Sequence, residues 1–232
     1  VTVDFGANLE SVQLTTFSNS PLQYINFVRD FGNEYAYGAA TAGVARDTRD
    51  SLIRVTSGTY LRASTEVAGG DLQYYRFGYQ HQWYYPLTRD LTLSLGGELG
   101  YASGYGNRPL PFFKNFFVGG PNSVRGYRSF SLGPRDELGN ATGGNRKLTG
   151  SAELLFPMPG ANRDPSLRLA AFIDAGQVYA NKYEPSDLRY STGLALFWSS
   201  PFGPLRLSFA HPLNAESGDR LQRLQFTFGY GF

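Results

Sequence analysis

The amino-acid sequence predicts an all-β fold, an antiparallel transmembrane β-barrel with about ten strands in this chain. Alternation between apolar and polar residues recurs along most of the 232 residues, as expected of strands that separate lipid from water. The chain also has 18 Phe, 16 Tyr and 28 Gly, which suits aromatic girdles and kinked strands. A mean hydropathy of -0.30 agrees with this class, because alternation distributes apolar residues among polar ones.

Composition argues against several other classes. The sequence has no run of 18 apolar residues, so we expect no helix that spans a bilayer. Without cysteine, neither a disulfide framework nor a thiolate metal site can form. A net charge of +2 gives no reason to expect nucleic-acid binding. The histidines, His81 and His211, lie far apart, and we expect neither a metal, a cofactor nor an enzymatic triad.

Period-2 alternation predicts five strands in the first half of the chain. In the first, Val1, Val3 and Phe5 share one face, and Thr2 and Asp4 share the other. A short amphipathic helix is expected after it, at about 21–31, with Leu22, Ile25 and Phe27 resting on the barrel or on the lipid interface. The five strands are expected at about 1–10, 35–46, 52–67, 72–86 and 91–101.

Five further strands are predicted in the second half, at about 147–157, 166–179, 188–199, 203–211 and 220–232. The last one has the clearest pattern. Its apolar face consists of Leu224, Phe226, Phe228, Tyr230 and Phe232. Its other face consists of Arg223, Gln225, Thr227, Gly229 and Gly231.

The connections alternate between short and long. Short turns are expected at 46–51, 86–90, 157–165 and 199–203, and longer loops at 11–34, 68–71, 102–146, 180–187 and 212–219. Outer-membrane barrels place short turns on the periplasmic rim and long loops on the extracellular rim. We therefore interpret residues 1–232 as one partial barrel domain in a bacterial outer membrane, in contact with lipid and lipopolysaccharide.

The 102–146 loop is too long for an ordinary turn, and its centre contains Arg125 among small and aromatic residues. That composition favours a loop that folds into the lumen. Glu153 and Asp174 lie on the polar faces of neighbouring strands and could both receive the guanidinium, which would relieve their mutual repulsion. Two plainer interpretations stay open: Arg125 could be solvated, and the two acids could line an aqueous pore.

Several motifs resemble the BamA-type superfamily of outer-membrane insertases and transporters. Val124-Arg125-Gly126-Tyr127, after Gly119-Gly120, resembles the signature of the family's sixth extracellular loop. Phe172-Ile173-Asp174-Ala175-Gly176 resembles its Phe-x-Asp-x-Gly strand motif. Glu153-Leu154-Leu155-Phe156-Pro157, Ser200-Pro201-Phe202-Gly203-Pro204-Leu205 and the aromatic carboxyl end are also similar. Together these motifs cover most of residues 91–232.

The resemblance implies a barrel that folds and inserts other outer-membrane proteins. Arg125, with Val124, Gly126 and Tyr127, would dock the loop against Glu153 and Asp174. The last strand would form one side of a lateral gate to which substrate strands add. The gate residues would be Leu224, Phe226, Phe228, Gly229, Gly231 and Phe232, the two glycines allowing a kink.

The chain departs from the family pattern in two respects. The family barrel has sixteen strands, and this sequence predicts ten; periplasmic POTRA domains are also absent from it. The resemblance therefore implies a carboxyl-terminal part of such a protein, or a shortened relative. Accessory assembly lipoproteins, expected as partners besides unfolded outer-membrane proteins, would bind mainly through the absent domains.

Other functions stay open at this stage. A TamA-like or two-partner secretion transporter shares the Arg-Gly-Tyr loop and the Asp motif. A passive porin-like channel would suit arginines on lumen faces, namely Arg62, Arg76, Arg168, Arg189 and Arg206. A hydrolase lacks a convincing set of Ser, His and Asp.

Overall fold

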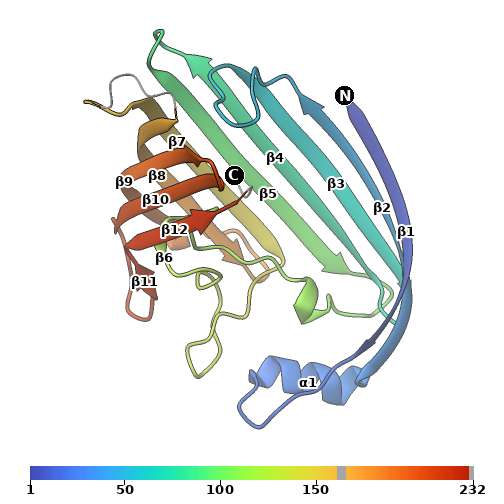
Figure 1. Ribbon diagram of the computed structural model, residues 1–232. Helices are drawn as coiled ribbons and strands as arrows, with labels where there is room; N and C mark the ends of the chain where they lie inside the picture. The colour runs from blue at the N-terminus through green and yellow to red at the C-terminus, as the bar shows by residue number, and fades with distance from the viewer. Residues whose placement is uncertain (161–165, 230–232) are drawn as a thin grey trace.

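The computed structural model describes residues 1–160 and 166–229. Within them, ten strands form one antiparallel sheet in the order β1-β2-β3-β4-β5-β7-β8-β9-β10-β12, so consecutive strands of the sheet are neighbours (Figure 1). The strands are β1 (Thr2–Gln13), β2 (Glu34–Asp47), β3 (Gly58–Gly70), β4 (Tyr74–Pro86), β5 (Thr92–Gly104), β7 (Arg146–Pro157), β8 (Leu167–Tyr179), β9 (Arg189–Ser200), β10 (Gly203–Pro212) and β12 (Leu224–Phe228).

Smaller elements lie in the connections. They are the helix α1 (Leu22–Phe31), the 3-10 turns η1 (Phe112–Lys114) and η2 (Pro185–Asp187), and the paired two-residue strands β6 (Gly126–Tyr127) and β11 (Leu221–Gln222). No helix in the part of the chain that the structure describes is long and apolar enough to cross a membrane.

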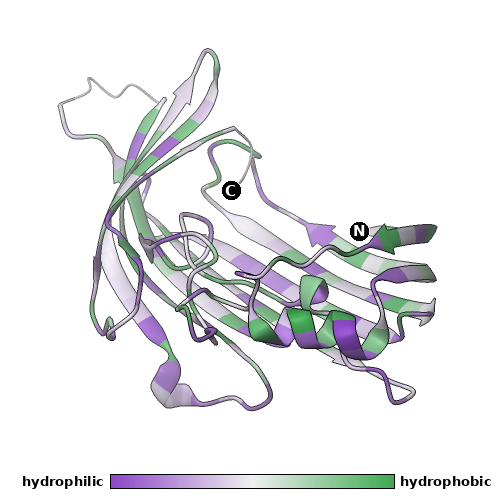
Figure 2. Ribbon diagram, turned by 90° about the horizontal axis from the view of Figure 1, so that it is seen from below, coloured by the Kyte–Doolittle hydropathy of each residue, from purple (hydrophilic) through white to green (hydrophobic). Residues whose placement is uncertain are grey.

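The two faces of the sheet differ as alternation predicts. In β8, Ile173 is 52% exposed on the outer face, whereas its neighbour Asp174 is fully buried on the inner face. In Figure 2, bands of hydrophobic and hydrophilic residues alternate along the strands. The predicted fold class, an antiparallel transmembrane barrel of which this chain contributes ten strands, is confirmed.

The sheet curls, and residues 105–145, which we call the inward loop, lie on its concave side between β5 and β12 (Figure 1). Both η1 and β6 belong to this loop. The helix α1 lies at the same rim as the long connections. Its Phe27 and Phe31 pack on the inner face of the sheet beside Tyr35, and Tyr24 stacks on Phe112 of the inward loop.

The helix prediction is therefore confirmed in its position. Phe27 packs on the sheet together with Phe31, whereas Leu22 is 55% exposed.

The third strand begins later than predicted. Residues 52–57 were expected in a strand, but β3 starts at Gly58, and residues 48–57 form the connection from β2. The carboxylate of Asp50 accepts hydrogen bonds from the backbone N–H groups of Thr56 and Ser57, which closes the turn. Gly58, the first residue of β3, follows with a φ of 105°, a conformation that glycine adopts readily.

Two predicted connection lengths also change. The turn expected at 46–51 covers residues 48–57, whereas the expected loop at 68–71 is a tight turn of residues 71–73 between β3 and β4. Asp71 ties that turn to β2, because its carboxylate accepts a hydrogen bond from the backbone N–H of Ala36 at 2.8 Å. The predicted alternation between short turns on one rim and long loops on the other therefore has exceptions in this chain.

The last predicted strand, 220–232, is interrupted. Residues Leu221–Gln222 form β11 and pair with the inward loop, and pairing with β10 begins only after them. The carbonyl of Arg223 accepts a hydrogen bond from the N–H of Ala210 at 2.8 Å, and β12 follows. Competition from the loop backbone explains this break, which alternation alone does not reveal.

Candidate functional site: the inward loop and the last strand

Arg125, from the inward loop, lies between two carboxylates on the sheet. Its Nε and Nη2 donate to the two oxygens of Asp174 at 2.7 and 2.6 Å, and its backbone N–H donates to the same carboxylate at 3.1 Å. Its Nη1 lies 2.5 Å from Oε1 of Glu153. The hydroxyl of Ser151 also donates to Asp174, at 2.7 Å. This bidentate geometry is the strongest that arginine and a carboxylate can make.

This cluster is removed from solvent. The Arg125 side chain is 3% exposed, that of Asp174 is fully buried and that of Glu153 is 16% exposed. Burial by itself would lower the pKa of Arg125, but the hydrogen bonds to Asp174 and the charge of Glu153 raise that pKa above its ordinary value. The guanidinium is therefore permanently charged, and each buried charge depends on the other for compensation.

The residues around Asp174 explain the spacing of the strand motif. The ring of Phe172, two residues before it on the same face, lies under the guanidinium, with 3.4 Å from the Arg125 Cζ to the ring centroid. Gly176, two residues after it, leaves room for the loop. A Cβ at Gly176 would lie 2.7 Å from Cγ2 of Val124. Phe172, Asp174 and Gly176 thus supply a platform, a charge and a space to one segment of the loop.

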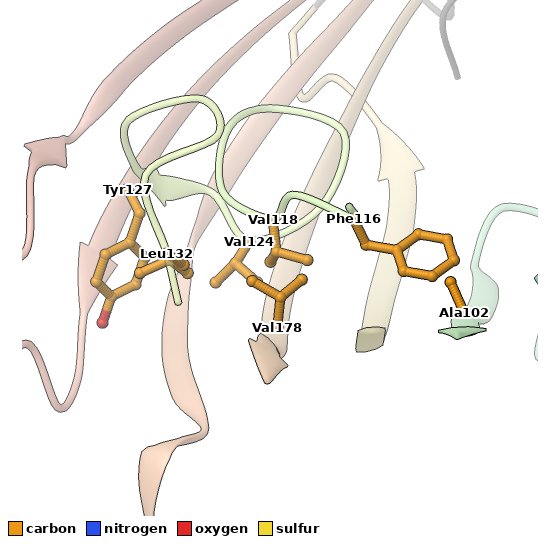
Figure 3. Packing of buried hydrophobic residues seen from close by; sticks show 7 residues of the cluster. All are labelled: Ala102, Phe116, Val118, Val124, Tyr127, Leu132 and Val178. Atoms are coloured by element: carbon orange, nitrogen blue, oxygen red, sulfur yellow. The ribbon is translucent and has the colours of Figure 1, made fainter. Parts of the chain in front are cut away.

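Val124 continues into an apolar cluster that packs the loop on the sheet (Figure 3). The cluster joins loop residues to residues of β5 and β8, and all of its members are buried: Ala102, Phe116, Val118, Val124, Tyr127, Leu132 and Val178. Burial of these side chains, rather than the ion pair alone, holds the loop on the concave face.

Gly126 and Tyr127 lie against the other end of the sheet. Gly126 has a φ of 90°, and a Cβ there would lie 3.1 Å from Cβ of Ala210 and 3.2 Å from Cγ of Pro212 on β10. Only glycine therefore fits this close approach. Tyr127 is fully buried, and its carbonyl accepts a 2.7 Å hydrogen bond from Nε2 of Gln225. Four consecutive residues thus connect β8 with the last strand.

The last strand presents its expected faces. Leu224, Phe226 and Phe228 are 59–62% exposed on the outer face, whereas Gln225 is 2% exposed on the inner one. Gly229 has a φ of 95°, and its backbone N–H donates to the Pro204 carbonyl of β10 at 2.9 Å. Of the predicted gate residues, Gly231 and Phe232 lie outside the described residues.

Sequence reasoning missed two sets of loop contacts. Nη2 of Arg206 on β10 donates to the Pro121 carbonyl and to Oδ1 of Asn122, both at 2.5 Å. Nζ of Lys114 lies 2.9 Å from Oε1 of Glu66 on β3. Arg206 stood on a predicted lumen face, so the available signal was a charge on an inner face opposite a long loop.

The sequence and fold of this chain can be compared with those of known proteins. A sequence profile described as the Omp85 superfamily domain matches residues 1–232, the whole chain. The chain belongs to the Omp85 superfamily. The outer membrane protein assembly factor BamA of Neisseria meningitidis serogroup B is 38% identical over 271 residues, which cover 99% of this chain and 34% of that protein. BamA of Nitratidesulfovibrio vulgaris is 30% identical, over 100% of this chain and 30% of the relative.

Eukaryotic members of the Omp85 superfamily also match. The sorting and assembly machinery component 50 homolog A of Xenopus laevis is 31% identical over 80% of this chain and 44% of its own length. The chain spans about a third of the bacterial relatives and less than half of this one.

A solved structure shares the fold. The crystal structure of BamA from Haemophilus ducreyi lacking POTRA domains 1-3 matches with a TM-score of 0.85 and 24% identity, over 97% of this chain and 49% of that one. The match supports the Omp85 barrel architecture of the ten-stranded sheet. The expected resemblance to the BamA-type family is confirmed by the profile and the relatives together.

The site offers backbone and charge rather than reactive groups. Within the described part of this Omp85 chain, no three His, Cys, Asp or Glu side chains gather in a way that could hold a metal ion. The site consists of a buried ion-pair cluster and a terminal strand, β12. The second edge of β12 has no neighbour in the described sheet. Such an edge can accept another strand through its backbone N–H and C=O groups.

Proposed function

We propose that this chain is the carboxyl-terminal part of the barrel of an outer-membrane protein assembly factor, which inserts β-barrel proteins by adding their strands at β12. One observation carries the proposal: β12 is the end of the described sheet and pairs only with β10. Strand addition to such an edge would satisfy the backbone groups of an incoming strand within the membrane. The assembly-factor role of the two bacterial relatives supports this function.

β12 is the last strand of the described sheet. In the described chain it has five residues, whereas β10 has ten. The residues that we assign to the lateral-gate strand are Leu224, Phe226, Phe228, Gly229, Gly231 and Phe232.

The inward loop would hold the lumen in its working arrangement. We assign this role to a clamp made by Val124, Arg125, Gly126 and Tyr127 with Glu153, Asp174 and the platform residues Phe172 and Gly176. The buried ion pair and the apolar cluster of Figure 3 support it. The energy for insertion would come from folding of the substrate itself, since its strands bury backbone groups and apolar surface as they pair.

A passive porin-like channel is less well supported, because packed loop residues occupy the concave face. Val118 and Leu132 are fully buried there. The secretion alternative shares this architecture, and only the destination of the substrate separates the two functions. The expected partners are the lipid bilayer with lipopolysaccharide, unfolded outer-membrane proteins and accessory lipoproteins of an assembly complex.

Site-specific crosslinking tests the proposal. In the full-length protein, which we expect to have no competing cysteine in this region, a cysteine at Phe226 should form a disulfide with a cysteine in the terminal strand of a stalled barrel substrate. A cysteine at Ile173 is a matched control, because this residue is also exposed on the outer face, at 52%, but lies on a strand paired along both edges.

We expect strong crosslinking at Phe226 and background at Ile173. Equal yields at both positions would contradict strand addition at β12. Recovery of a crosslinked substrate outside the cell, rather than in the membrane, would instead support secretion.

A further inference from the structure

The last segment of the chain divides between two partners at Arg223. Before it, Leu221 and Gln222 pair with Tyr127 and Gly126 of the inward loop. After it, Leu224 and the residues that follow pair with β10. In Figure 1, β6 and β11 lie together beside the end of β12. The first part of this segment therefore pairs with the loop backbone, and the second part pairs with β10.

Two further contacts fix the position of the division. The N–H of Arg128 donates to the carbonyl of Arg220 at 2.7 Å, which extends the pairing of β6 with β11. Nε2 of Gln225 donates to the carbonyl of Tyr127 at 2.7 Å, and the Gln225 side chain is 2% exposed. Gln225 thus touches the loop although its backbone belongs to the β12 ladder with β10.

The loop itself cannot slide. Arg125, the residue before Gly126, is tied by its side chain and its backbone N–H to Asp174 on β8. Gly126 is confined against Ala210 and Pro212. A slip of β12 by two residues would preserve its apolar and polar faces, so alternation alone does not select one register. A contact between Gln225 and a fixed carbonyl does select one.

We propose that the inward loop sets the register of the last strand against β10. Gln225 is the positioning residue, because its side chain hydrogen-bonds to the carbonyl of Tyr127 in the loop. This inference rests on the proposed function, because the register of β12 determines where an incoming strand would start. The loop then has a second role besides filling the lumen. Because it is bound to β8 through Asp174 and to β12 through Gln225, it fixes the position of β12 relative to β8.

The chain lacks cysteine, so register can be measured by disulfide trapping. Leu207 and Phe226 are opposite each other in the ladder, and both are exposed on the outer face. Cysteines at these positions report the native register. Cysteines at Leu207 and Leu224, or at Leu207 and Phe228, report slips of two residues. The measurement uses the full-length protein in outer-membrane vesicles, and a heated-gel shift selects folded molecules.

Gln225→Leu should raise the ratio of slipped to native crosslinks about fivefold, the change expected when one buried hydrogen bond is lost. Gln225→Asn, which keeps the amide but is one methylene too short to reach the carbonyl, should change the ratio in the same direction; it serves if Gln225→Leu fails to fold. Thr227→Val is the matched control on the same face of β12, because the Thr227 hydroxyl donates to the Arg206 carbonyl and not to the loop.

An unchanged ratio in a folded Gln225 variant would overturn the inference and leave the proposed function standing. An equal rise in Thr227→Val would also overturn it, since the effect would then not come from the loop. Crosslinking to a stalled substrate separates the two proposals. If a stalled substrate crosslinks no better at Phe226 than at Ile173, strand addition at the free edge of β12 fails, whereas the register measurement keeps its meaning.

Discussion

Asp174 is the residue on which the position of the inward loop depends most directly. It is fully buried and receives three hydrogen bonds from Arg125, two from the guanidinium and one from the backbone. A buried carboxylate without its partner would be far less stable than the pair. The cluster therefore enforces one loop conformation, because every alternative leaves a charge uncompensated in the sheet interior.

Arg125→Ala should destabilise the folded chain by about 3–5 kcal/mol, since Asp174 and Glu153 would stay buried without a countercharge. Denaturant titration followed by a heated-gel shift measures the loss. Asp174→Asn should have a similar effect, and the double variant should be less destabilised than the sum of the two. Arg29→Ala is the control: its pair with Asp30 is exposed and screened by solvent, so its removal should leave stability nearly unchanged. Additive effects would mean that the two residues act independently.

Gly176→Ala should destabilise the chain by about 1–3 kcal/mol, because the new Cβ would lie 2.7 Å from Cγ2 of Val124 and 2.9 Å from Cγ2 of Thr149. Val124→Ala in the same chain should relieve part of that cost, which thermal unfolding of the single and double variants can measure. Gly150→Ala on β7 is a matched control, since its Cβ would only approach a carbonyl at 3.9 Å. Equal losses at Gly176 and Gly150 would contradict the packing explanation.

At the scale of the element, alternation predicted where strands lie but not always where they begin or end. The outward side chains of β8 and β12 were assigned correctly. Side chains alternate between the two faces of a strand, so one known apolar face fixes the orientation of every residue. The 52–57 segment was misassigned, since its turn depends on the Asp50 carboxylate and on Gly58. The break at Arg223 depends on a loop almost a hundred residues earlier, which no local pattern can reveal.

The contacts of the candidate site were likewise only partly predictable from the sequence. The ion pair of Arg125 with Asp174 could be expected, because both acids lay on polar faces and the loop was long enough to reach them. The contact of Gln225 with Tyr127 could not be expected, since a glutamine on a polar strand face is ordinary in any barrel. Backbone acceptors leave no trace in side-chain patterns.

Phe226→Arg should impair integration of the barrel into the membrane. The Phe226 side chain is 62% exposed on the outer face of β12, and an arginine on a lipid-facing strand costs roughly 2–4 kcal/mol at the bilayer midplane. The yield of folded protein in outer membranes measures the effect. Thr227→Arg, one residue later on the inner face, should be tolerated better. Equal yields of the two variants would mean that the faces of β12 are assigned wrongly.

At the scale of the whole molecule, the described sheet has two ends, β1 and β12, which do not pair with each other. Figure 1 shows β1 and β12 on different sides of the curled sheet. Both ends carry apolar outer side chains, for example Phe5 on β1, which is 82% exposed. An unpaired edge within lipid is costly, so both ends require further strands, and we expect these to come from the rest of a larger barrel.

Disulfide trapping between the two ends tests this expectation. In the full-length protein, cysteines at Phe5 and Phe228 should give no crosslink within one molecule, because other strands would separate them. Cysteines at Phe5 and Ala42, which are opposite each other in the ladder between β1 and β2, should crosslink readily and serve as the control. Efficient crosslinking of Phe5 with Phe228 would show instead that ten strands close on themselves. In that smaller barrel, strand addition at β12 would require the β1–β12 seam to open first.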